Sequence, residues 1–115
     1  MASIGAEPYE RIPPMSALDD INKYTTADAT VVASMEKTYA LVLSKADARL
    51  VAFGDPEELK TVRENFVKGK LGVTDSDDSI DAEIKAVGER VPGQRQRLTV
   101  YYLLAEQYGK LGVFA

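Results

Sequence analysis

Five residues near the C-terminal end of the sequence combine cationic, aromatic and apolar chemistry. Arg95 and Arg97 precede Tyr101, Tyr102 and Leu103 in one apolar run. A basic cluster beside tyrosines can hold phosphate and stack on bases. Positive charge at a helix start also costs a little stability, which hints at a purpose other than folding. The alternative is that these are solvated arginines above core tyrosines, so the five residues are a possible binding surface.

Residues 75–81 form an acidic stretch, Asp-Ser-Asp-Asp-Ser-Ile-Asp. Oxygen ligands on alternate residues are what a calcium ion needs. However, Ile80 stands where the calcium loop needs glycine, and Ala86 stands where it needs a bidentate glutamate. We therefore interpret the stretch as a helix-capping loop and expect no metal site.

Catalytic chemistry has little support in the composition. The chain has no histidine and no cysteine, which removes the usual base near neutral pH and any thiol nucleophile. The adjacent pairs Glu57-Glu58 and Asp77-Asp78 cannot point at one reacting atom, and helix-start electrostatics already explains them. Residues 69–71 (Gly-Lys-Leu) share only two letters with a phosphate-binding loop. We expect no enzyme activity and no cofactor.

Length and charge limit the remaining classes. A chain of 115 residues is the usual size of one domain. Its formal charge of -4 opposes non-specific attraction to nucleic acid or to an anionic membrane. No apolar run approaches the ~18 residues of a membrane span, and no secretory signal is evident. We expect a cytoplasmic protein, without membrane contact and with nucleic acid as the least expected partner.

The chain divides into an arm and a helical domain. Residues 1–15 contain Gly5, Pro8, Pro13 and Pro14, and the residue before a proline is pushed away from helical geometry. We expect residues 1–15 to be an irregular or disordered arm and residues 16–115 to be a single helical domain.

Helix signals recur along that domain. The clearest is a start at Asp55, followed by Pro56 at the first helical position and two glutamates in the first turn. The sequence predicts helices over 16–24, 28–43, 55–68, about 80–91 and 94–108, with a brief capped turn in 47–53 that ends at Gly54. We expect the 55–68 helix to stop at Gly69 and the last helix to stop at Gly109.

The last helix is the element around which we expect the domain to be organised. It is apolar around most of its girth, so it must be covered on more than one side. Sustained two-residue alternation is absent, although residues 50–53 or 100–104 could hide a strand. The fold class we predict is all-α, a compact bundle of five or six short helices packed antiparallel and orthogonally. The apolar tail after Gly109 is expected to pack back onto it.

One internal repetition is visible. The pentapeptide Gly-Lys-Leu-Gly-Val occurs at residues 69–73 and again at residues 109–113. It indicates either a duplicated helical hairpin or two helix ends that use the same stop chemistry.

Three stretches together carry a family resemblance. They are residues 46–52 (Ala-Asp-Ala-Arg-Leu-Val-Ala), residues 55–66 with the Lys-Leu-Gly at 70–72, and residues 101–106 (Tyr-Tyr-Leu-Leu-Ala-Glu) with the Gly-Lys at 109–110. The chain from about Asp19 onward resembles a small bacterial family catalogued only as a domain of unknown function. The resemblance implies a compact, mostly helical cytoplasmic protein and brings no activity, ligand or catalytic residue.

Two hypotheses about function follow. The first is a non-enzymatic helical module that binds another protein, or itself as a homodimer, through an apolar helix face. It rests on a surplus of apolar residues: Tyr101, Tyr102, Leu103, Leu104, Val113 and Phe114. The alternative is a protein that binds a small molecule or nucleotide in a pocket surrounded by Arg49, Arg63, Arg95 or Arg97.

Overall fold

The computed structural model describes residues 16–115, apart from the side chain of Asp47. Over this range the chain is helical and contains no strand, so the all-α prediction is confirmed. The arm predicted for residues 1–15 lies outside the described residues. None of the helices formed by residues 16–115 is long and apolar enough to cross a membrane.

The described residues form six α-helices, one π-helix and two 3-10 turns. The α-helices are α1 (Ala17–Ile21), α2 (Ala29–Thr38), α3 (Ala40–Leu43), α4 (Pro56–Thr61), α5 (Asp77–Arg90) and α6 (Arg97–Gln107). The π-helix η3 (Val62–Lys70) continues directly from α4, and the 3-10 turns are η2 (Ala46–Ala48) and η4 (Leu111–Val113).

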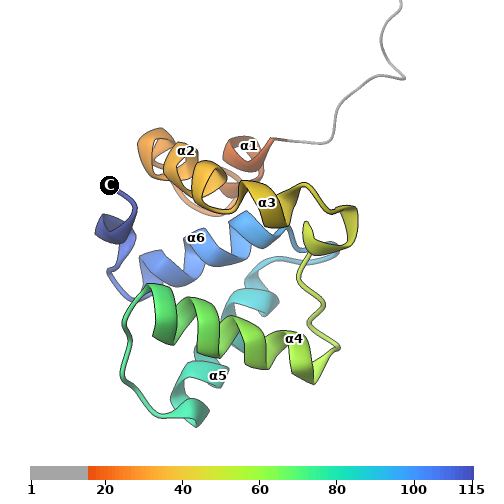
Figure 1. Ribbon diagram of the computed structural model, residues 1–115, viewed down its shortest axis with the longest axis vertical. Coiled ribbons are helices and arrows are strands. Elements are labelled where there is room, and N and C mark those ends of the chain that lie inside the picture. The colour runs from red at the N-terminus through yellow and green to blue at the C-terminus, as the bar shows by residue number, and fades with distance from the viewer. Residues whose placement is uncertain (1–15) are drawn as a thin grey trace, which may run out of the picture.

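Helix α6 lies at the centre of the fold. It passes between a layer formed by α1, α2 and α3 and a second layer formed by α4 and α5 (Figure 1). Every residue of α6 from Arg97 to Ala105 is buried. The prediction of a last helix that must be covered on several sides is therefore confirmed.

Local capping chemistry sets the helix starts. The Ser16 hydroxyl accepts a hydrogen bond from the Asp19 amide at 3.1 Å, and the Asp28 carboxylate accepts from the Thr30 amide at 2.9 Å. At α4, Asp55 accepts from the Glu57 amide at 3.0 Å. Each side chain satisfies a backbone donor that the helix leaves free. The starts predicted at Ser16, Asp28 and Asp55 are confirmed.

The single helix predicted over residues 28–43 is wrong, because the chain breaks at Tyr39. Its backbone angles, φ -106° and ψ 18°, end α2 and begin the short α3. The Tyr39 ring packs edge-on against Tyr101 at 5.2 Å and also lies 6.3 Å from Phe66 and from Phe114. The break keeps this ring in an aromatic cluster, while Leu41 and Val42 of α3 face outward and Leu43 packs against the core.

The prediction that the helix beginning at Asp55 stops at Gly69 is wrong. The helix continues as η3 through Lys70, and the Leu71 amide donates to the Phe66 carbonyl, five residues back, at 2.9 Å. The core residues Val62, Phe66 and Leu71 are four and five positions apart. That spacing suits the i→i+5 hydrogen bonds of a π-helix.

The two copies of the pentapeptide end their helices differently. In the first copy the fourth residue, Gly72, has a positive φ of 73°, whereas in the second copy the first residue, Gly109, has a φ of 67°. The last helix therefore ends at Gly109 as predicted. Of the two interpretations of the repeat, the one in which both helix ends use the same stop geometry is wrong.

Residues 46–53 connect the two layers and pair with the backbone just before α6. The helical turn predicted to carry Leu50, Val51 and Phe53 is absent. Only residues 46–48 are helical, and Leu50 forms an isolated antiparallel bridge with Gln96. The Val51 amide donates to the Arg95 carbonyl at 2.8 Å, and the Arg97 amide donates to the Arg49 carbonyl at 2.7 Å. This bridge fixes where α6 begins. At the other end the tail packs back as expected, with Phe114 buried in the core.

Candidate functional site

Three of the five residues predicted as a binding surface lie inside the protein. Tyr101, Tyr102 and Leu103 are 6%, 1% and 0% exposed, because other elements cover α6 on all sides. The Tyr102 hydroxyl accepts a hydrogen bond from the Asp28 amide at 2.9 Å and so joins α6 to the start of α2. The structure corrects the predicted surface at these three positions, which belong to the core.

Arg97 is also buried, and all three nitrogens of its guanidinium donate hydrogen bonds within the protein. Its Nε donates to the Ala48 carbonyl at 2.6 Å and Nη1 donates to the Tyr101 hydroxyl at 2.9 Å. Nη2 forms a 2.7 Å ion pair with Glu58 and lies 3.4 Å from the Leu50 carbonyl. Arg97 therefore joins α6 to α4 and to the 48–50 segment, and it offers no free edge to a ligand.

Burial and the neighbouring groups shift the pKa values of Arg97 and Tyr101 in opposite directions. Burial works to lower the pKa of Arg97, but Tyr101 and Glu58 outweigh it, so that the pKa of the guanidinium is raised. Burial raises the pKa of the Tyr101 hydroxyl against the lowering influence of Arg97. The arginine thus stays charged, and the phenol stays neutral and accepts its hydrogen bond.

Arg95, only two residues earlier, has a different environment. Its Nε donates to the Gly88 carbonyl at 2.9 Å, and its guanidinium carbon lies 4.8 Å from the centre of the Phe53 ring. Nη1 and Nη2 have no hydrogen-bond or ion-pair partner among the described side chains and backbone of residues 16–115. The side chain is half-buried, so one edge of a fixed guanidinium is left available.

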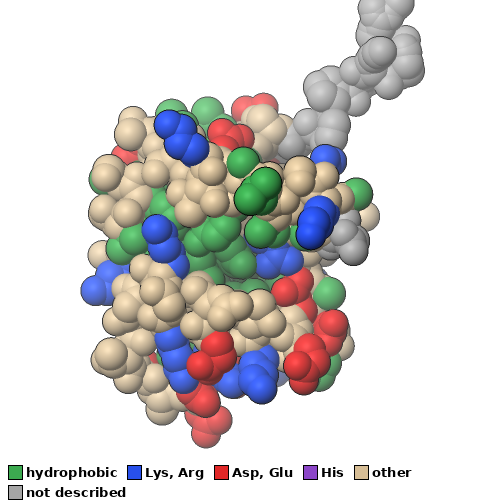
Figure 2. Space-filling view, viewed as in Figure 1, with side chains coloured by type: hydrophobic (Ala, Val, Ile, Leu, Met, Phe, Trp, Pro, Cys, Tyr) green, Lys and Arg blue, Asp and Glu red, His purple; other side chains and the backbone are tan. Residues whose placement is uncertain are grey.

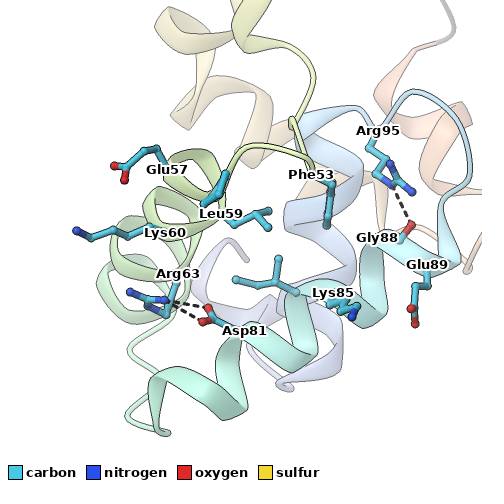
Figure 3. Close-up of a pocket in the computed structure, with 12 residues that line it drawn as sticks. Phe53, Glu57, Leu59, Lys60, Arg63, Asp81, Lys85, Gly88, Glu89 and Arg95 are labelled. Carbon is cyan, nitrogen blue, oxygen red and sulfur yellow. Dashed lines mark hydrogen bonds and ion pairs between the residues drawn. The ribbon is translucent and has the colours of Figure 1, made fainter.

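Arg95 lines a cavity of about 700 Å³ between α4, η3 and α5. Phe53 and Leu59 point into it, whereas Glu57 and Lys60 point away (Figure 3). The lining residues are Phe53, Pro56, Glu57, Leu59, Lys60, Arg63, Asp81, Ile84, Lys85, Gly88, Glu89 and Arg95. The cavity therefore has an apolar interior and a charged rim.

Gly88 makes room for the Phe53 ring in the wall of this cavity. A Cβ atom at position 88 would lie 2.6 Å from Cδ2 of Phe53 and closer still to Cε2. Glycine inside a helix costs ~1 kcal/mol relative to alanine. In α5 the missing side chain of Gly88 allows the Phe53 ring to lie directly against the helix backbone, beside the Gly88 carbonyl that accepts from Arg95.

At the opposite end of the cavity, Arg63 is saturated by carboxylates. Its Nη1 donates to both oxygens of Asp81 at 3.0 Å, and its Nε donates to Glu64 at 2.8 Å. Hydrogen bonds from Arg63 and Lys68 hold the pKa of Glu64 below its usual range, and Lys68 and Arg63 do the same for Asp77. This cluster joins η3 to α5, so Arg63 is not a free cation.

The four arginines suggested for a common pocket do not converge. Arg63 and Arg95 line the cavity, Arg97 is buried beside Glu58, and Arg49 lines a second cavity of about 540 Å³ between α1, α3 and the start of α6. Arg49 is further held by a 2.8 Å hydrogen bond from Nε to the Leu43 carbonyl. Among the described residues, Arg95 is the arginine that lines the cavity of about 700 Å³ through a guanidinium bonded at Nε alone, and Arg49 is held in the same way beside the second cavity.

The acidic stretch behaves as a helix start. Ser76 caps α5 by accepting from the Ser79 amide at 3.2 Å, and Asp77 and Asp78 occupy the first turn. Across residues 16–115, no group of histidine, cysteine or acidic side chains is placed to hold a metal ion.

Sequence reasoning missed the apolar interior of the cavity. Phe53, Leu59, Ile84 and Gly88 come from a loop and two helices, and sequence spacing cannot bring them together. The available signal was Gly88, a glycine placed inside the apolar stripe of α5, which indicates close approach by another group.

The fold and the cavity define an all-α protein built on one buried central helix, with a ligand-sized space between two of the surrounding helices. The chain belongs to the family described as "Protein of unknown function (DUF2853)", which matches residues 16–112 and so includes every α-helix of the domain. No curated protein matches the chain.

Proposed function

We propose that this protein binds a small molecule in the cavity between α4 and α5. The observation that carries the proposal is the cavity itself: about 700 Å³, lined by the partly buried Phe53 and Leu59, with the core residue Ile84 at its base. Ligand pockets are typically ~300–1,000 Å³, mostly apolar, with a few placed polar groups. Arg95 is such a group, because its position is fixed and one edge of its guanidinium is unused.

The proposed role is binding rather than catalysis. Of the acidic groups that line the cavity, Asp81 is held by Arg63, and Glu57 and Glu89 are exposed. The chain also lacks histidine and cysteine. Nothing beside the apolar interior is therefore arranged as a nucleophile with its base. As part of the same proposal the protein acts in the cytoplasm, which a cysteine-free sequence suits.

A thermal-shift screen tests the proposal, with neutral, anionic and phosphorylated metabolites as probes. A ligand at a hundredfold excess over its Kd stabilises the folded state by ~2.7 kcal/mol, which is readily measured as a rise in Tm. We expect the substitution Leu59→Trp to fill the cavity and abolish the rise. The matched control is Leu41→Trp, the same change at a position 85% exposed on α3.

The control should keep the full response. An empty screen would contradict the proposal, and so would compounds that stabilise Leu59→Trp as strongly as the unaltered protein.

Protein interaction is the second candidate function, favoured by one specific observation. Helix α3 reads Ala-Leu-Val-Leu, and its Leu41 and Val42 are 85% and 40% exposed. Figure 2 shows hydrophobic side chains gathered between the α2 and α3 layer and the continuous helix of α4 and η3. Exposed apolar patches mark interaction sites. A second copy is the simplest partner, because a two-fold axis would cover the same turn on both chains.

Sedimentation equilibrium tests this second candidate. We expect association that rises with concentration and is lost in Leu41→Lys. It should persist in Ser44→Lys, which adds the same charge at an exposed polar position just after α3. A protein that stays monomeric at every concentration, or a Leu41→Lys variant that associates normally, would contradict self-association.

A further inference from the structure

We infer that the cavity between α4 and α5 selects a small organic monoanion with a flat apolar body, of the aryl carboxylate type, and that Arg95 binds its charged group. The inference rests on the proposed small-molecule binding and specifies which chemistry is bound.

The Arg95 guanidinium is held in a position that suits binding of a carboxylate. Its Nε is occupied by the Gly88 carbonyl, and its guanidinium lies over the Phe53 ring. The Arg95 backbone is also fixed, because its carbonyl accepts from the Val51 amide at 2.8 Å. The edge that carries Nη1 and Nη2 stays without a partner in the described part of the structure. Two parallel N–H groups on a planar edge match the two oxygens of a carboxylate.

The charges around the cavity favour a single negative charge. Arg63 is neutralised by Asp81 and by neighbouring carboxylates. Lys60 and Glu57 point away from the cavity and offset each other, and the exposed Lys85 and Glu89 on its rim also offset each other, which leaves Arg95. The surplus is therefore one positive charge. A polyphosphate would need several cations or a loop of backbone N–H groups, and a cationic ligand would meet the Arg95 guanidinium.

The interior of the cavity favours a flat apolar body. Phe53 and Leu59 point into the same space between α4 and α5 (Figure 3), and Ile84 lines it from α5. Gly88 lets Phe53 lie close against α5, so the ring forms one wall. An aromatic ligand gains from stacking on such a ring beyond the area that it buries. A neutral ligand of the same shape would fill the space but leave the Arg95 edge unpaired.

Calorimetric titration with matched probe pairs tests this inference on the full chain. Each pair is a carboxylate and its neutral carboxamide: benzoate and benzamide, naphthoate and naphthalenecarboxamide, phenylpropanoate and phenylpropanamide. Naphthyl phosphate is the dianionic comparison. We expect at least one carboxylate to bind roughly ten- to a hundredfold more tightly than its amide, the range given by charge-assisted hydrogen bonds.

Two variants assign the charged group to Arg95. In Arg95→Gln the preference for carboxylate should disappear, while affinity for the amide is kept. Arg49→Gln removes the same charge outside this cavity and should leave the preference unchanged. Circular dichroism checks that both variants are folded, and the comparison of carboxylate with amide on the unaltered protein does not depend on either variant.

Three results would overturn the inference. An amide that binds as tightly as its carboxylate would remove the selection for an anion and leave small-molecule binding intact. Tighter binding of naphthyl phosphate than of naphthoate would replace the monoanion by a dianion. If no probe binds, the ligand class is wrong, and the proposed function itself fails only if the broad thermal-shift screen is empty as well.

Discussion

The buried ion pair between Arg97 and Glu58 makes a quantitative prediction about stability. Arg97→Met keeps most of the side-chain volume and removes every donor. It leaves the Glu58 carboxylate without its 2.7 Å partner and the Ala48 carbonyl without its 2.6 Å donor. Removing one partner of a buried pair typically costs ~3–5 kcal/mol. The Glu58 side chain is 19% exposed and can be partly hydrated, so we expect about 3 kcal/mol.

Urea unfolding followed by far-UV circular dichroism measures this loss. For a domain of about 100 residues, a loss of 3 kcal/mol should also lower the Tm by more than ~10 °C. The double variant Arg97→Met, Glu58→Met should recover part of the loss, because no uncompensated charge remains. The carbonyls of Ala48 and Leu50 still lack a donor, so we expect the double variant to remain ~1–2 kcal/mol below the unaltered protein.

Arg95→Met is the matched control for this prediction. Arg95 is half-buried and has no ion pair with any described side chain, so its loss should cost about 1 kcal/mol. If Arg97→Met costs less than ~1 kcal/mol, or no more than Arg95→Met, the assignment of Arg97 to the structural framework is refuted.

Three further predictions follow. The Tyr108 hydroxyl is buried without a hydrogen-bond partner in the described part of the chain; in urea unfolding, Tyr108→Phe should keep or raise stability, whereas Tyr102→Phe should lose about 1 kcal/mol. Burial, and secondarily Tyr101, raises the pKa of Tyr39 to about 12. The unfolded chain therefore loses this proton first, so stability measured against pH should be intact below about pH 10, fall towards pH 12, and fall less steeply in Tyr39→Phe. Gly88→Ala should lower the Tm, because the Cβ meets Phe53, and adding Phe53→Ala should reverse the sign of the Gly88→Ala effect.

Local chemistry made the helix starts predictable. Asp55 accepts a hydrogen bond from a neighbour two residues away, so everything that the cap needs lies in one short segment. The stripe of Ile80, Ile84, Val87 and Val91 was predictable for the same reason, because helical periodicity places all four on one face and all four are buried.

Long-range contacts account for what could not be predicted. The break at Tyr39 depends on Phe66, Tyr101 and Phe114, which are far away in the sequence. At Val62 the hydrogen bonding changes from α-helical to π-helical, and no residue near this position signals the change in the way that a capping residue signals a helix start. Such elements are decided by packing, which propensity and spacing do not describe.

Arg95 and Arg97 show the same limit within the candidate site. Both stand near the start of α6, and the sequence treats them alike. Arg97 becomes buried because Glu58, 39 residues earlier, meets it across the fold. Arg95 keeps a free edge because Gly88 and Phe53 occupy only its Nε and one face. The sequence correctly indicated arginine as the residue type of interest. Only the tertiary structure separates Arg97, which is structural, from Arg95, which lines the cavity.

Methyl NMR of the protein, titrated with the best compound from the screen, tests whether ligand binds between α4 and α5. We expect saturable shifts concentrated on Leu59 and Ile84, which line the cavity, with the methyl groups of Leu41 unchanged and no shifts in the Leu59→Trp variant. Shifts centred on Leu41 and Val42 would point instead to the surface of α3, and unchanged Leu59 and Ile84 signals at saturation would contradict binding in this cavity.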